Sequence, residues 1–118
     1  MIRPDRLTEH LVELLRIPST SRGEGAVAAR LAKDLRALGA TVAFDGAGEA
    51  VGGEVGNCIA RLPGTVAGAP PLLLNAHMDN VPGGTGAVAR DGGLLRSDGR
   101  GILTVLIAFA ISFAPFAS

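Results

Sequence analysis

Cysteine, aromatic residues and net charge are all scarce in this sequence of 118 residues. Cys58 is the only cysteine, so no disulfide can form within the chain, and we expect a reducing, cytoplasmic location. Tryptophan and tyrosine are absent, and eleven basic residues balance eleven acidic ones. Because nucleic-acid binding relies on a basic surface and on aromatic stacking, we expect no nucleic-acid partner.

Charge is also missing from the C-terminal stretch, where no charged residue occurs from Gly101 to Ser118. Thr104 alone interrupts an apolar run from Ile102 to Ile111. Because this stretch is shorter than the ~20 residues that a membrane-spanning helix needs, a buried helix or strand is favoured over a membrane span. Two other interpretations stay open. Residues 104–118 could mediate self-association, or they could derive from a shifted reading frame.

The periodicity of the apolar residues predicts two helices followed by several strands. Leucines between residues 7 and 15 follow the i, i+4, i+7, i+8 spacing of an amphipathic helix, predicted over residues 5–16 and ended by Pro18. A similar stripe predicts a second helix over residues 24–38. The order of elements indicates an α/β layer fold, with helices packed on a sheet. Short apolar runs between turn residues predict strands over residues 40–44, 57–62, 71–76 and 94–96.

Residues 45–56 are rich in glycine and alanine and are predicted to form a loop. Within it, the glycines of Gly46-Ala47-Gly48 do not have the spacing of a dinucleotide-binding fingerprint, and no helix is predicted to follow them. We therefore expect no phosphate-binding role for this loop.

His77 and Asp79 follow the predicted strand over residues 71–76 and are the strongest candidates for chemistry. Leu72-Leu73-Leu74 would be apolar on both faces, which is typical of a buried interior strand. Functional groups in open α/β sheets lie at the carboxyl ends of strands. A neutral imidazole is a common zinc ligand, and an Asp two residues away can accept its other N–H and orient it.

A histidine and an aspartate at the end of a strand also cap turns, so the His-x-Asp tripeptide alone does not identify a metal site. His10 is the only other histidine. It falls on the polar side of the first predicted helix, where a solvated surface residue is expected.

The flanking sequence adds a resemblance to a known family. The motifs LVELLRIPSTSRGEG, NCIARLPG, LLLNAHMDNVPGG and DGGLLRSDG occur in the same order as in the zinc-dependent exopeptidases. That family includes tripeptidase T, glutamate carboxypeptidase, aminoacylase and succinyl-diaminopimelate desuccinylase. The chain resembles the N-terminal part of these enzymes, from about Leu7 to Leu103, and is most similar to the tripeptidase-like branch.

The resemblance implies a partial three-layer catalytic domain, with helices packed on a mixed sheet, over residues 1–103. It implies a site for two zinc ions, in which His77 binds one zinc and Asp79 is a catalytic residue that orients His77. It also implies hydrolysis of short peptides or acylated amino acids by a metal-bound water and a Glu base.

This sequence departs from the family's pattern after Leu103. The family's bridging Asp would fall at Leu106 or Thr104, neither of which is a carboxylate. No glutamate follows Glu54 and no histidine follows His77, so the base and the remaining ligands have no counterpart. The aspartates at 91 and 98 each precede a glycine and are predicted to be turn residues.

A catalytic zinc has three protein ligands, whereas this sequence offers one. We therefore expect a truncated metallopeptidase-like hydrolase that binds zinc weakly at most and is inactive alone, with residues 104–118 as an apolar segment that does not match the family. The alternative is a non-catalytic interaction module that uses this apolar tail.

Overall fold

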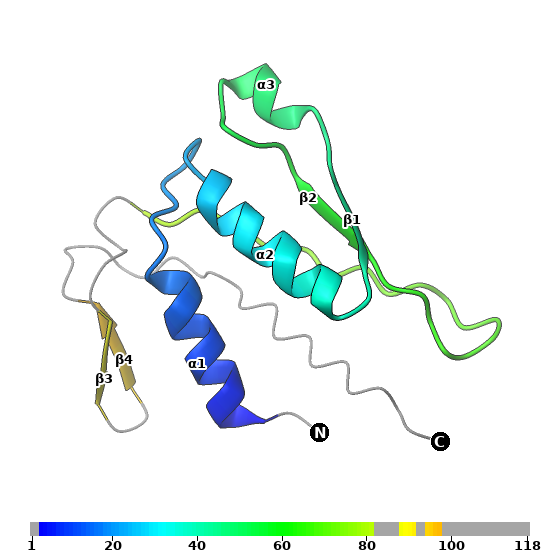
Figure 1. Cartoon of the computed structure of the whole chain (residues 1–118), viewed down its shortest axis with the longest axis horizontal. Coiled ribbons are helices and arrows are strands. Elements are labelled where there is room, and N and C mark those ends of the chain that lie inside the picture. Colours follow the sequence, from blue (N-terminus) through cyan, green and yellow to red (C-terminus); the bar gives the residue numbers. More distant parts are fainter. Residues whose placement is uncertain (1–2, 82–87, 92–93, 98–118) are drawn as a thin grey trace.

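The first two helices of the computed structural model lie where the apolar periodicity predicts them (Figure 1). The structure describes residues 3–81, 88–91 and 94–97. Helix α1 (Pro4–Leu15) begins at a proline, whose fixed φ angle suits the first helical position. Helix α2 (Gly25–Ala37) is followed by Gly39, whose φ of 90° is a conformation that favours glycine. The predicted helices are thus confirmed to within one residue at each end.

A small apolar core joins the two helices. Leu14 and Leu15 of α1 and Val27 of α2 are buried and form one cluster. Four half-buried side chains pack around this cluster: Leu11, Ile17, Leu31 and Met78. Because Met78 comes from a segment far along the chain, the core also fixes the chain next to His77.

An ionic network also links α1 to α2. The Arg30 guanidinium donates hydrogen bonds to Glu13 and, at 2.8 Å, to Oδ2 of Asp34. The hydrogen bond from Arg30 lowers the pKa of the Glu13 carboxyl below its ordinary value. Nε2 of His10 lies 3.9 Å from the same Asp34 oxygen, and the His10 side chain is only 24% exposed. The prediction of a solvated surface histidine is therefore wrong, because His10 lies between the two helices.

An antiparallel pair of strands follows α2. Strand β1 (Thr41–Phe44) pairs with β2 (Cys58–Arg61), so that Thr41 lies opposite Arg61 and Phe44 opposite Cys58. Helix α2 contacts both strands, which gives a helix packed on a sheet. The predicted strands over residues 40–44 and 57–62 and the α/β class are confirmed.

The connection between β1 and β2 contains a short helix, α3 (Ala47–Val51), where a loop is predicted. Oδ1 of Asp45 accepts hydrogen bonds from the N–H groups of Ala47 and Asn57, at 3.1 and 2.8 Å. Gly52 has a φ of 68° and ends the helix in the left-handed conformation. The expectation that no helix follows Gly46 is wrong, because Asp45 organises the first turn through a bond to the distant Asn57.

The segment over residues 71–76 is neither a strand nor buried, in contrast to the prediction. Leu72, Leu73 and Leu74 are 76%, 87% and 44% exposed. A strand with apolar side chains on both faces needs covering layers and a neighbouring strand on each side. The described part of the chain supplies neither, because β1 and β2 pair only with each other.

A second antiparallel pair consists of β3 (Val88–Asp91) and β4 (Leu94–Ser97). The predicted strand over residues 94–96 is confirmed as β4, whereas β3 was not predicted. Asp91 is the last residue of β3 and pairs with Leu94, the first residue of β4, so it borders the connection between the two strands. Both sheets within the described ranges are antiparallel, and the parallel contact found there is an isolated bridge between Thr20 and Asn80.

Several predictions fall on residues outside the described ranges. These are the turn at Asp98, the positions of the missing bridging carboxylate and the apolar tail over residues 104–118. Within the described ranges, none of the helices is long and apolar enough to cross a membrane.

Replacing Leu14 by alanine tests the core. Leu14 is fully buried between α1 and α2, so Leu14→Ala should lower the free energy of unfolding by about 2–5 kcal/mol. The control is Leu38→Ala, at a leucine that is 42% exposed, which should change it by less than about 1 kcal/mol. Urea denaturation followed by circular dichroism measures both. Equal losses would show that this cluster is not the core.

Candidate metal-ligand site

The four residues from His77 to Asn80 alternate between solvent and the interior, as in an extended chain. The His77 side chain is 83% exposed, whereas Met78 packs against the core of α1 and α2. Asp79 is 32% exposed, and Asn80 is buried. This alternation presents the imidazole outward while its neighbours hold the backbone in place.

Two hydrogen bonds from Asn80 link this segment to the loop between α1 and α2. Its backbone N–H donates to the carbonyl of Ser19 at 2.6 Å, and its Nδ2 donates to Oγ of Ser19 at 2.9 Å. Ser19 and Asn80 are both buried, so the two hydrogen bonds are shielded from water. The loop after α1 therefore determines where the His-x-Asp pair lies.

Asp79 connects the same loop to the imidazole. Ser21 Oγ donates a hydrogen bond to Oδ2 of Asp79 at 2.5 Å, and Oδ1 of Asp79 lies 3.3 Å from Nδ1 of His77. The Ser21 hydrogen bond lowers the pKa of the Asp79 carboxyl below its ordinary value, while partial burial opposes this shift. Because Nδ1 faces the carboxylate, Nε2 is the nitrogen left for a ligand.

The structure thus brings His77 and Asp79 together, as the spacing suggests, and adds three residues that the sequence reading missed. Ser19, Ser21 and Asn80 hold the pair in place. No role is predicted for the run Ser19-Thr20-Ser21, which follows Pro18. The partners of these serines, Asp79 and Asn80, lie about sixty positions further along the chain. No local sequence pattern predicts a contact between residues so far apart.

The residues in this region do not fit a catalytic zinc. Within the ranges that the structure describes, no three His, Cys, Asp or Glu side chains gather closely enough to hold a metal ion. The described residues therefore do not supply the three or four protein ligands that a zinc site needs. Cys58 does not add a nucleophile, because burial raises the pKa of its thiol and keeps it protonated at neutral pH.

Helices packed on a sheet define the chain as an α/β protein, the class of fold that the resemblance to the zinc-dependent exopeptidases implies. Within that class, the chain is similar to the crystal structure of aminopeptidase PepT from Bacillus cereus ATCC 10987, with a TM-score of 0.80 and 32% sequence identity. The match covers 86% of this chain and 28% of that chain. The resemblance to this family is thus confirmed, and the chain spans less than a third of the aminopeptidase's length.

No model of a protein family matches the sequence. No curated protein matches it either.

Replacing Asn80 tests how the site is anchored. Asn80→Ala should leave Oγ of the buried Ser19 without its partner and lower the free energy of unfolding by about 1–3 kcal/mol. Asn75→Ala, at an exposed asparagine of the same segment, is the matched control and should cost less than about 0.5 kcal/mol. Thermal or urea unfolding measures both. A neutral Asn80→Ala would contradict the anchoring role.

The pKa of Asp79 gives a pH-dependent prediction. Because the folded-state pKa lies below the unfolded one, Asp79 contributes stability above its ordinary pKa, and this is lost as the pH falls through the folded pKa. Ser21→Ala should raise the folded pKa towards its ordinary value and shrink that contribution. Carboxyl NMR titration of Asp79 measures the shift, with Asp45 as the internal reference. An unchanged titration in Ser21→Ala would show that the hydrogen bond does not form in solution.

Proposed function

We propose that these 118 residues carry one zinc-ligand position of an exopeptidase site and do not hydrolyse peptides by themselves. The observation that carries the proposal is the contact between Asp79 and Nδ1 of an exposed His77, in a chain that matches part of an aminopeptidase. His77 would be the ligand, and Asp79 would orient its ring. The substrates implied for a complete site are short peptides or acylated amino acids.

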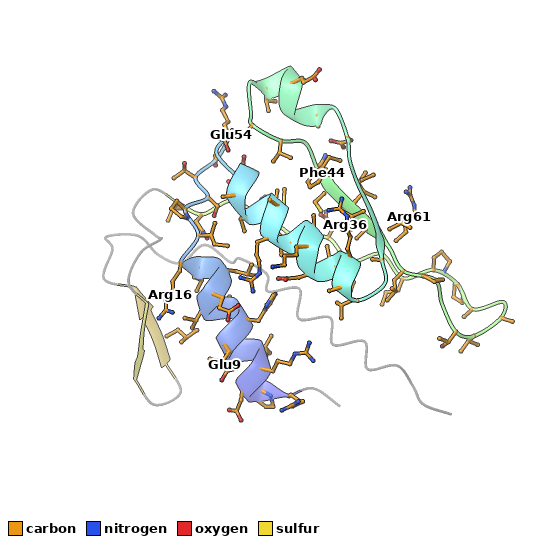
Figure 2. The ribbon with its side chains drawn as sticks, viewed as in Figure 1. Glu9, Arg16, Arg36, Phe44, Glu54 and Arg61 are labelled. Atoms are coloured by element: carbon orange, nitrogen blue, oxygen red, sulfur yellow. The ribbon has the colours of Figure 1, made fainter. Side chains whose placement is uncertain are left out.

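Three carboxylates of this chain support the proposal of inactivity, because each accepts hydrogen bonds from groups away from His77. Oε2 of Glu54 accepts a hydrogen bond from the N–H of Gly25 at 3.0 Å, beside the first turn of α2 (Figure 2). Oε1 of Glu24 accepts from the N–H of Arg22 at 2.9 Å. Asp45 is bound to Asn57 and to the first turn of α3. None of these three groups lies in a ligand cluster with His77.

The resemblance to the family also gives the residue ranges to which this proposal applies. Residues 1–103 would correspond to a portion of the family's three-layer catalytic domain with its mixed sheet, and residues 104–118 would lie outside that pattern. A cytoplasmic location is part of the same proposal.

A metal titration combined with a peptidase assay tests the proposal. The purified chain should bind less than one zinc ion per molecule and should show no chelator-sensitive cleavage of a tripeptide. His77→Ala should weaken the residual zinc binding, whereas His10→Ala should not, because His10 lies between α1 and α2 beside Asp34. Isothermal titration calorimetry measures binding, and the intact Bacillus cereus aminopeptidase is the positive control for turnover. Robust cleavage that is abolished both by a chelator and by His77→Ala would refute the proposed inactivity.

A further inference from the structure

The loop between α1 and α2 contains a backbone conformation that favours glycine at a residue that is not glycine. Arg22 has a φ of 73°, in the left-handed region. A residue with a side chain adopts this conformation at an energetic cost and keeps it only where its surroundings hold it. Arg22 directly follows Ser21, whose hydroxyl is bonded to Asp79. The strained residue is therefore adjacent to the contact that leads to His77.

Hydrogen bonds to both of its backbone groups hold Arg22 in this conformation. Its N–H donates to Oε1 of Glu24 at 2.9 Å, and its carbonyl accepts from the N–H of Glu54 at 3.0 Å. The carbonyl of Thr20 accepts from the N–H of Gly23 at 2.7 Å, which closes a turn over the two residues between them. The loop is thus held from within by Thr20 and Glu24, and from the connection between β1 and β2 by Glu54.

Glu54 also holds the loop at a second point. Its Oε2 accepts a hydrogen bond from the N–H of Gly25 at 3.0 Å, so this residue binds the loop through its own N–H and through its carboxylate (Figure 2). Glycine at position 25 leaves room for the carboxylate, because a Cβ there would lie 2.7 Å from Oε2. A residue between α3 and β2 therefore fixes both ends of the stretch from Arg22 to Gly25, which follows Ser21.

The hydroxyl of Ser21 holds one oxygen of Asp79 and leaves the other for His77. Ser21 Oγ donates to Oδ2 at 2.5 Å, and Oδ1 lies 3.3 Å from Nδ1 of the imidazole. Because the carboxylate is held through one oxygen, its other oxygen stays directed at the ring. In a neutral imidazole, the hydrogen bond that one nitrogen makes decides which nitrogen carries the proton. An acceptor at Nδ1 favours a proton on Nδ1 and a lone pair on Nε2.

We propose that Ser21 and Glu54 are positioning residues that fix the tautomer of His77. Ser21 acts through its contact with Asp79, and Glu54 acts by holding the backbone that carries Ser21. The connection between β1 and β2 thereby influences which nitrogen of an exposed imidazole is free to bind. The inference deepens the proposed function, because it rests on His77 as the ligand position and on Asp79 as the residue that orients it.

Nitrogen NMR of the isotope-labelled, metal-free chain measures the tautomer. At about pH 9, where an ordinary imidazole is neutral, we expect the Nδ1–H form of His77 to predominate. Ser21→Ala should lower the ratio of the Nδ1–H form to the Nε2–H form by about twofold or more, because Asp79 is then free to turn away from the ring. Ser21→Thr keeps the hydroxyl at an exposed position and should restore the ratio.

Variants of Glu54 test the more distant part of the proposal. Glu54→Ala should change the ratio in the same direction as Ser21→Ala but by less, because the backbone N–H at position 54 remains. Glu54→Gln keeps an oxygen that accepts from the N–H of Gly25 and should give the ratio of the unmodified chain. Glu49→Ala is the matched control, because Glu49 is an exposed glutamate of the same connection, in α3, and should leave the ratio unchanged.

His10 is the internal reference for folding, because it lies between α1 and α2 and its ring signals should be the same in every variant. A tautomer ratio that Ser21→Ala leaves unchanged would overturn the proposal, as would a Ser21→Thr variant that behaves like Ser21→Ala. Equal ratios in Glu54→Ala and Glu49→Ala would refute the part assigned to Glu54. These measurements contain no zinc and no peptide, so their outcome is separate from the zinc affinity and turnover that test the proposed inactivity.

Discussion

The buried contact between Ser19 and Asn80 is the constraint on which the arrangement of this chain depends. It joins the loop after α1 to a segment 61 positions away through two hydrogen bonds between buried residues. Among the described residues, no backbone hydrogen bond connects residues 70–79 to the helices. The position of His77 therefore follows from this contact and from the packing of Met78, rather than from a strand within a sheet.

The same segment is anchored at its C-terminal end, whereas its three leucines are exposed. Ser21, Asp79 and His77 form a connected polar arrangement, whereas Leu72 and Leu73 remain in solvent. This contrast is what a portion of a larger α/β layer would show. The hydrogen bonds that anchor the segment need only the loop after α1 to be in place. Burial of the leucines needs strands and layers that the described residues do not provide.

The elements that could be predicted from the sequence are those specified by neighbouring residues. The leucine stripe of α1 and the similar apolar stripe of α2 are local signals, and both predicted helices are confirmed. Helix α3 was missed because Asp45 organises it together with Asn57, a partner that local patterns do not reveal. Strand β3 was missed because its sequence, Val88–Asp91, lacks apolar alternation and is recognised only through its pairing with β4.

The order and spacing of the motifs were enough to place this chain beside the exopeptidases. The single residue between His77 and Asp79 also allows the contact between their side chains that the structure shows. The count of carboxylates after Asp79 was likewise readable without a structure. Three-dimensional packing added what depends on distant neighbours: Ser21 as the partner of Asp79, Ser19 as the partner of Asn80, and the exposure of the leucines. Apolarity measures the tendency of a side chain to be buried, but whether it is buried depends on what the rest of the fold places around it.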